Sequence, residues 1–114
     1  MNATAIADAR LRSERPTVVQ TQHTGEVVCA LGGEFDMGSA DVLSDALDRA
    51  VAVGEPRLVV DLTDTVFMDS SALNLLLEAR TRLAAEGRWL MTRNAQRPVA
   101  RLLDLVRRRH GIVL

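Results

Sequence analysis

The residues with the clearest chemical potential form the short segment Met68-Asp69-Ser70-Ser71, which sets a carboxylate beside two hydroxyl groups. The segment lies between an apolar run that ends at Leu62 and a stretch of helical spacing that includes Leu73. In α/β proteins, functional residues usually lie at such junctions between a strand and a helix. For these residues taken alone a structural use is favoured, because a serine hydroxyl can cap a helix by accepting a hydrogen bond from a free backbone N–H.

A serine enzyme is the first chemical hypothesis, and the spacing argues against it. The nucleophile elbow of a hydrolase needs glycine two residues before and two residues after its serine, and neither Ser70 nor Ser71 has them. A catalytic base is also scarce, since the pattern places His23 in a hairpin turn and His110 at the end of a helix. We therefore expect no catalytic residue and no enzymatic activity.

The residue types present also argue against a cofactor site and against a metal site. All 14 basic residues are arginines, which excludes a P-loop lysine and a Schiff-base lysine. The single cysteine, Cys29, sits in an apolar stretch, and no cluster of cysteine and histidine has the spacing of a zinc site. Gly32-Gly33 is followed by the carboxylates of Glu34 and Asp36, which would repel a phosphate. We expect neither a metal nor a cofactor.

Length and charge restrict the remaining classes of function. The 114 residues suit one domain, with 47% hydrophobic residues and a formal net charge of -1. This charge gives no general electrostatic case for nucleic acid or an anionic membrane surface. No apolar run approaches the ~20 residues of a membrane span, and the N-terminus lacks a secretory hydrophobic region. The expected location is the cytoplasm.

Hydrophobic periodicity predicts a polar, flexible tail over residues 1–16 and a single domain over residues 17–114. Strands are expected at residues 17–22, 26–31, 57–62, 88–92 and, as a last edge strand, 112–114. Gly32-Gly33 is expected to end the second of these. Amphipathic helices are expected after an N-cap at Ser39, after Ser70 or Ser71, and from Pro98 to His110. Strands that alternate with helices imply crossovers and a largely parallel sheet.

Three segments in this order resemble a known family. They are Gly33-Glu34-Phe35-Asp36, then Leu58-Val59-Val60-Asp61-Leu62, then Phe67-Met68-Asp69-Ser70-Ser71-Ala72-Leu73. Together they resemble the STAS domain of bacterial anti-sigma factor antagonists, over a length that runs from about Thr17 to the C-terminus. The resemblance implies an α/β fold with a mixed sheet of four to five strands and helices packed mainly on one face.

The resemblance also implies a function, which is to bind an anti-sigma factor so that a sigma factor is released. In such proteins the anti-sigma factor is a serine kinase that phosphorylates a serine at this helix start, which by position is Ser70. ATP and Mg²⁺ would belong to that kinase, and a phosphoserine phosphatase is a possible further partner. The resemblance places Asp69, Ser71, Asp36 and Glu34 on the partner surface, with Ser71 also expected as the helix cap.

Charge explains how such a switch could work. A phosphoserine carries about −1.5 to −2 charges at pH 7, which a helix N-terminus tolerates through its dipole. Burying that charge beside Asp69 against a partner would cost several kcal/mol, enough to abolish binding while the fold stays intact. Two alternatives remain open at this point: a STAS scaffold that binds its partners constitutively, in a sensor or transporter complex, and a small serine enzyme.

Overall fold

The computed structural model describes residues 15–114, so that most of the predicted tail, residues 1–14, lies outside the described range. The strands in this range are β1 (Thr17–His23), β2 (Glu26–Phe35), β3 (Arg57–Asp61), β4 (Thr65–Met68) and β5 (Trp89–Arg93). The helices are the 3-10 turn η1 (Met37–Ser39), α2 (Ala40–Ala52), α3 (Ser70–Ala84) and α4 (Arg97–His110). The predicted alternation of strands and helices is confirmed, with β4 as an additional strand.

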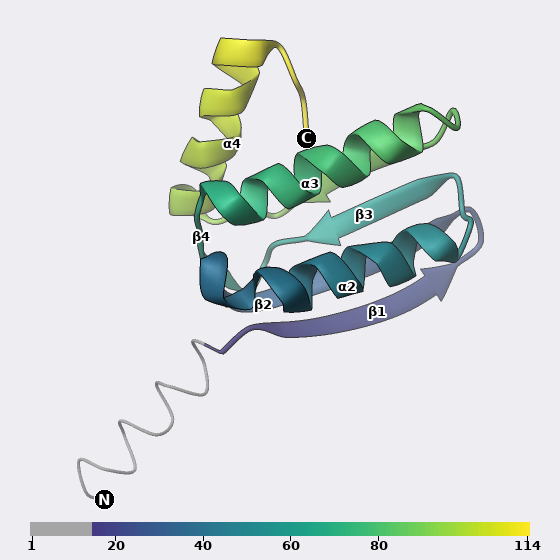
Figure 1. Cartoon of the computed structure of the whole chain (residues 1–114), viewed down its shortest axis with the longest axis horizontal. Coiled ribbons are helices and arrows are strands. Elements are labelled where there is room, and N and C mark those ends of the chain that lie inside the picture. The colour runs from purple at the N-terminus through teal and green to yellow at the C-terminus, as the bar shows by residue number, and fades with distance from the viewer. Residues whose placement is uncertain (1–14) are drawn as a thin grey trace, which may run out of the picture.

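The strands form one mixed sheet in the order β1-β2-β3-β5, with β4 paired to the end of β2 (Figure 1). β1 and β2 form an antiparallel hairpin in which His23 pairs with Glu26. β3 runs parallel to β2 and β5 runs parallel to β3, because a helix connects each pair. The prediction of a mixed sheet of four to five strands is therefore confirmed.

The prediction that Gly32-Gly33 ends the second strand is wrong, because β2 continues to Phe35. Gly33 has a φ of 89°, and the register shifts between Gly33 and Glu34, which marks a β-bulge. A Cβ at Gly32 would lie 2.5 Å from Oγ1 of Thr17, so any other residue here would force the Thr17 side chain to move. Before the glycines β2 pairs with β3, and after them it pairs with β4.

The two short segments near β4 and at the C-terminus also differ from expectation. The pattern gives no strand at β4, because both central residues, Val66 and Phe67, are exposed and four residues show no alternation. The strand predicted over residues 112–114 is wrong, since the chain is irregular after Gly111, the C-cap of α4. Leu114 instead packs against the hydrophobic core.

The core lies between the sheet and the two helices α2 and α3, which lie side by side over one face of the sheet (Figure 1). Alternate residues of β2, namely Val27, Cys29 and Leu31, belong to this core together with Leu43 of α2 and Leu76 of α3. Each of these side chains is at most 1% exposed. The 0% exposure of Cys29 confirms that it is a core residue, and this burial raises the pKa of its thiol to about 11.

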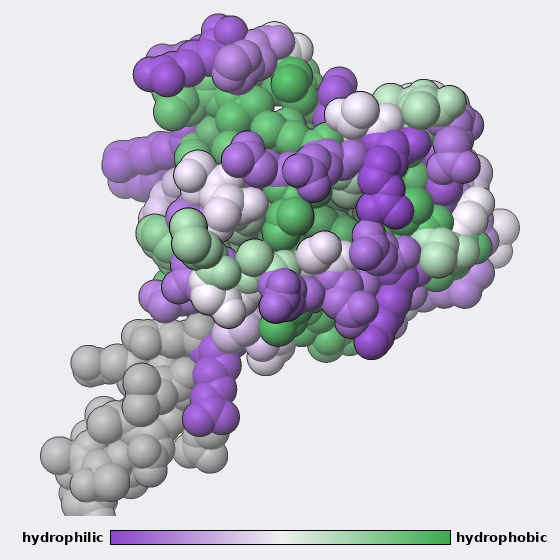
Figure 2. Space-filling model, viewed as in Figure 1, coloured by the Kyte–Doolittle hydropathy of each residue, from purple (hydrophilic) through white to green (hydrophobic). Residues whose placement is uncertain are grey.

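α4 packs beside β4 through Val99 and Val106, which are buried. Figure 2 shows hydrophilic residues on the outer side of this helix and hydrophobic residues beneath it. The last turn carries Arg107, Arg108 and Arg109, where positive charge suits the C-terminal end of the helix dipole. Within the described part of the chain, every helix is too short or too polar to cross a membrane.

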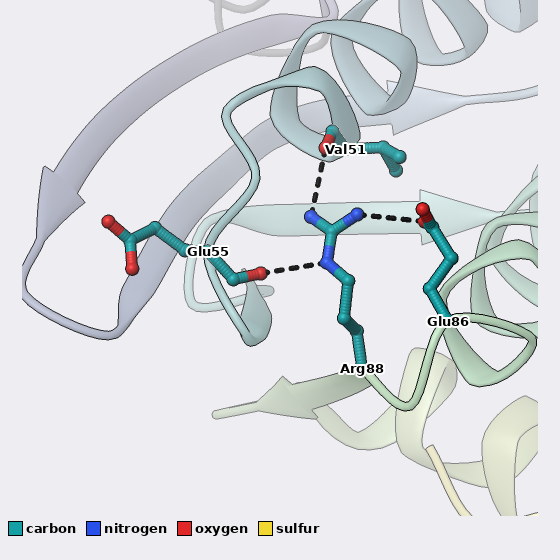
Figure 3. Close-up of polar contacts among 4 residues, drawn as sticks. All are labelled: Val51, Glu55, Glu86 and Arg88. Atoms are coloured by element: carbon teal, nitrogen blue, oxygen red, sulfur yellow. Dashed lines mark hydrogen bonds and ion pairs between the residues drawn. The ribbon is translucent and has the colours of Figure 1, made fainter.

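One arginine joins three elements at the end of the sheet opposite β4. Arg88, directly before β5, donates from Nε to the backbone oxygen of Glu55 at 3.0 Å and from NH2 to that of Val51 at 2.9 Å (Figure 3). Its NH1 donates to the carboxylate of Glu86 at 3.0 Å. The side chain is only 14% exposed, so these bonds hold the end of α2 and the start of β3 against β5 in a partly desolvated position.

Replacing Arg88 with Ala should destabilise the domain by about 1–3 kcal/mol, because two carbonyl oxygens lose their donors in a half-buried position. Arg88→Lys should recover only part of this, since an ammonium cannot reproduce the planar fork. Urea unfolding followed by circular dichroism measures the change.

The matched control is Arg82→Ala, which removes an exposed pair with Asp48 whose side chains are 52% and 58% exposed. It should change stability by less than about 1 kcal/mol. An Arg88→Ala protein as stable as Arg82→Ala would contradict the role given to Arg88.

Candidate functional site

The start of α3 is fastened by Asp69 and not by a serine. Asp69 is the N-cap, with an extended backbone, and its Oδ1 accepts a hydrogen bond from the backbone N–H of Ala72 at 3.1 Å. The same oxygen accepts a hydrogen bond from the hydroxyl of Ser71 at 2.6 Å. The expectation that Ser70 or Ser71 caps the helix is therefore wrong: Ser71 supports the cap by holding the carboxylate in place.

These contacts stabilise the ionised form of Asp69. The hydroxyl of Ser71 first, and the backbone N–H of Ala72 second, hold the pKa of the Asp69 carboxyl below its ordinary value. Hydrogen bonds donated to a carboxylate favour its charged state. The dipole of α3 acts in the same direction, because negative charge is stabilised at a helix N-terminus. The site therefore carries a fixed negative charge at neutral pH.

Ser70 is different from both of its neighbours. It is the first residue of α3 and is exposed, whereas Asp69 and Ser71 are half-buried. Among the hydrogen bonds of residues 15–114, those that fasten this helix start use Asp69, Ser71 and Ala72, and none uses the Ser70 hydroxyl. Its hydroxyl is thus accessible for modification and is not needed for the cap.

Pairing between β2 and β4 brings the second predicted segment to this place. Phe35 pairs with Met68 and Glu34 pairs with Phe67 in parallel register. The backbone N–H of Asp69 then donates to the carbonyl of Phe35 at 3.1 Å, which joins the end of β2 to the cap of α3. The start of α3 and η1 consequently lie at the same end of the molecule (Figure 1).

Asp36 has a structural task as well as an exposed position. Its carboxylate accepts from the backbone N–H of Ser39 at 3.2 Å, while its own N–H donates to the Ser39 hydroxyl at 2.9 Å. This reciprocal pair is a capping box that closes η1. Ser39 occupies the N-cap position of α2, as expected, but its side chain makes no cap bond to that helix.

The predicted acidic residues meet at a shallow recess beside η1. The recess has a volume of about 270 Å³ and is lined in part by Glu34, Asp36, Ser39 and Val42. Glu34 is half-buried and Asp36 is exposed. The structure therefore brings Glu34 and Asp36 together at one recess and connects their segment to Asp69 through the backbone.

Three exposed apolar side chains lie near these segments, and two of them, Met37 and Val66, were not predicted as functional residues. Met37, the first residue of η1, is 79% exposed. Val66 and Phe67 on β4 are 49% and 44% exposed. The backbone of Met37 also contributes to the lowered pKa of Asp69, so η1 lies close to the cap. The sequence left open whether Phe67-Met68 belongs to the core or presents an apolar contact next to Ser70. Met68 is a core residue, whereas Phe67 is exposed. Large apolar side chains beside exposed carboxylates are typical of a protein-binding surface.

Other chemistry has little support in this region. His23 lies at the hairpin end of β1 and His110 is the last residue of α4, so neither belongs to the β4–α3 junction. Within residues 15–114, no group of three or more histidine, cysteine, aspartate or glutamate side chains could hold a metal ion.

Comparison with known proteins agrees with this geometry. A family model described as "Mlab, STAS domain" matches residues 18–113 of the chain. The chain belongs to the STAS domain family. The resemblance seen in the three sequence segments is thereby confirmed, and the site at the β4–α3 junction lies within the matched range.

Individual proteins with similar sequences belong to the same family. A STAS-domain containing protein of Pseudomonas aeruginosa is 35% identical over 80 residues, which cover 70% of this chain and 78% of the relative. The anti-sigma-F factor antagonist RsfB of Mycobacterium tuberculosis is 37% identical over 60 residues, which cover 53% of this chain and 49% of the relative. The name of RsfB gives that relative the role of an anti-sigma factor antagonist, and STAS antagonists of this kind are generally non-enzymatic.

The fold of the STAS domain has a close structural counterpart. The crystal structure of an anti-sigma factor antagonist from Mycobacterium paratuberculosis superimposes with a TM-score of 0.71 at 29% sequence identity. The match covers 82% of this chain and 79% of the other. The predicted fold class is confirmed by this likeness.

Ser71→Ala should raise the pKa of Asp69 toward the ordinary aspartate value of about 3.9, because it removes the largest cause of the lowering. NMR titration of the Asp69 carboxyl carbon measures this shift. A lowered folded-state pKa contributes stability that is present above the unfolded pKa and lost as the pH falls through the folded one. The pH-dependent part of the difference between parent and variant should therefore shrink on acidification.

Ser70→Ala is the matched control for this titration. It removes a hydroxyl one residue away that does not contact Asp69, so the pKa of Asp69 should stay at the parent value. An equal rise in both variants would show that the Ser71 hydroxyl has no special part in the cap.

Proposed function

We propose that this STAS domain is an anti-sigma factor antagonist that loses its partner when Ser70 carries a phosphate. The partner is an anti-sigma factor that is itself the serine kinase, and ATP and Mg²⁺ are bound by that kinase. A phosphoserine phosphatase restores the binding form. The domain acts in the cytoplasm of a bacterium and regulates transcription only through its protein partner, without touching nucleic acid or membrane.

The observation that carries the proposal is the unequal state of the two serine hydroxyls. The Ser71 hydroxyl is engaged with Asp69 at 2.6 Å, whereas Ser70 is exposed at the first position of α3. A kinase needs a hydroxyl that can enter its active site without unfolding the substrate. Ser70 satisfies this requirement, and Ser71 could be modified only by breaking the bond that supports the cap.

Phosphate at Ser70 is compatible with the folded domain. The negative group would lie at the N-terminus of α3, where the helix dipole and free N–H groups favour an anion. The cap does not depend on the Ser70 hydroxyl, so Asp69 can keep its bond to Ala72. The fold therefore tolerates both states, which a reversible switch requires.

Phosphate at Ser70 is incompatible with a partner that covers this surface. Asp69 already carries a charge whose ionised form is stabilised, and Glu34 and Asp36 lie on the adjoining segment. The exposed side chains of Met37 and Phe67 supply apolar contacts that would exclude water from the same surface. A phosphate desolvated there without a cation costs several kcal/mol, and each 1.4 kcal/mol is tenfold in affinity.

Two other functions from the sequence remain as outcomes of the test. A constitutive STAS scaffold would use the same surface but would bind equally well with and without phosphate. A serine enzyme would need a base near Ser70, and both histidines lie on other elements.

Incubation with the anti-sigma factor kinase and ATP should place phosphate on Ser70, located by mass spectrometry of the intact protein and its peptides. Titration calorimetry of each form of the protein with the kinase and a non-hydrolysable ATP analogue should then give a defined order of affinity for the kinase. Parent and Ser70→Ala should bind within about twofold of each other. Ser70→Asp should bind more weakly, and the phosphorylated protein by at least a further tenfold, because phosphate carries more charge than one carboxylate.

Ser71→Ala provides the specificity control, since it should still accept phosphate at Ser70. Phosphate found only at another residue would contradict the assignment of Ser70. Equal binding by the phosphorylated and unphosphorylated proteins would favour the constitutive scaffold, and turnover of a model ester that depends on Ser70 would favour the enzyme.

Asp36→Asn should weaken partner binding by about three- to tenfold through loss of a charge on the contact surface. Asparagine is also a good N-cap residue, so the capping box with Ser39 is largely kept and the melting temperature should be nearly unchanged. Asp36→Ala should in addition lose stability of about 0.5–2 kcal/mol. Unchanged affinity in Asp36→Asn would remove Asp36 from the partner surface.

A further inference from the structure

Within residues 15–114, β1 is an edge strand without the usual protection against pairing with another strand. It is the first strand in the order of the sheet, and its pairing among the described residues is with β2 alone. Its seven residues, Thr17–His23, include no proline, arginine, lysine, aspartate or glutamate. Natural edge strands are usually shielded by charge, proline, bulges or a covering element, because their free N–H and C=O groups pair readily.

A groove runs beside this edge, between β1 and α2. It has a volume of about 810 Å³. The lining residues are Val18 and Gln20 of β1 with Asp41, Val42, Asp45, Ala46 and Arg49 of α2. Val42 is 44% exposed on this side of the helix. Figure 1 shows α2 lying along β1, so the free strand edge and the open flank of the helix face the same way.

We propose that this edge is the dimer interface of the protein, with β1 of one copy antiparallel to β1 of a second copy. A two-fold axis through Gln20 places Val19 opposite Thr21 of the second copy on one face of the joined sheet. On the other face it places Val18 opposite Gln22 of the second copy. Since the strand carries no formal charge, no like charges meet between the two copies of β1.

The spacing of strands brings the two copies of α2 into contact. α2 packs over β1 and β2. Neighbouring strands lie about 4.8 Å apart, so two helices that are each centred between β1 and β2 would stand two strand spacings apart, at about 10 Å. Packed helices have interaxial distances of about 8–10 Å. Each helix would therefore fill the groove of the other copy, and the exposed side chain of Val42 would become buried.

The charges along the groove select a second copy as the occupant. Asp41, Asp45 and Arg49 follow one another at four-residue spacing on the lining side of α2. The two-fold axis reverses the direction of the helix, so Asp41 of each copy meets Arg49 of the other. Asp45 of both copies lies beside the axis, where the Arg49 of its own helix, at 2.8 Å, offsets its charge. The side chains of Arg49 and Asp45 are 74% and 62% exposed, so both groups stay accessible. A uniformly basic or acidic partner would match only part of this pattern.

This interface does not include the phosphorylation site, and the groove shares only Val42 with the recess beside η1. Ser70 and Asp69 belong to the β4–α3 junction, and neither lines the groove. Failure of the dimer would leave the phosphorylation proposal unaffected, and the reverse also holds.

Analytical ultracentrifugation of the full chain over a range of concentrations is expected to show a monomer–dimer equilibrium. Gln20→Glu should raise the dissociation constant at least tenfold, because two carboxylates would then face each other on the axis beside Asp45 of both copies. Thr81→Glu on α3 adds the same charge away from β1 and should leave the dissociation constant unchanged.

Charge reversal gives a second and independent readout. Asp41→Arg and Arg49→Asp should each weaken the dimer, since each sets like charges opposite one another across the axis. The double variant should restore dimerisation, which a merely structural effect of either residue would not do. Hydrogen exchange of the parent should show protection of the β1 amides that point away from β2, and this protection should be lost on dilution.

A parent chain that stays monomeric at several hundred micromolar would overturn the proposal. So would a dimer that is insensitive to Gln20→Glu, or a double charge reversal that binds no better than the single ones. Protected edge amides in a monomeric parent would show that another part of the same chain occupies the edge, and this would also overturn it.

Discussion

The parallel pairing of the end of β2 with β4 is the constraint on which the rest of the structure depends. Two hydrogen bonds bracket this pairing: Gly33 donates to the carbonyl of Asp64 at 2.9 Å, and Asp69 donates to that of Phe35 at 3.1 Å. Two parallel strands need a crossover connection between them. Here the connection from β2 to β4 consists of α2 and β3, so the pairing fixes both ends of this segment. It also sets η1 against the start of α3, which places both halves of the proposed partner surface side by side.

The segment Asp69-Ser70-Ser71 divides structural and functional tasks among adjacent residues. Asp69 and Ser71 secure the helix through one carboxylate oxygen, and this leaves Ser70 without a structural role. A modification site on a rigid helix start changes the charge of the surface without a change of fold. The response can therefore be read directly by a partner that desolvates this surface.

The partner surface and the dimer edge are connected through η1 and α2. Asp36 closes η1, which continues directly into α2, and Val42 borders both the recess beside η1 and the groove beside β1. A dimer built on β1 would hold α2 between two copies while leaving the start of α3 exposed. Two copies of the Ser70 site would then be presented by one assembly.

The sequence by itself determined the features that depend on neighbouring residues: the helices, the buried strands, the core position of Cys29 and the concentration of polar groups at Asp69-Ser70-Ser71. The features that depend on distant residues were decided by the tertiary structure. All three polar residues could cap a helix by chemistry alone, and the extended backbone at Asp69 selected its carboxylate. Gly32-Gly33 is typical of a break, but Thr17 and β4 make it a bulge. β4 has no alternation of apolar and polar residues, because pairing with β2 makes it a strand. The exposure of Phe67 follows from its place on β4.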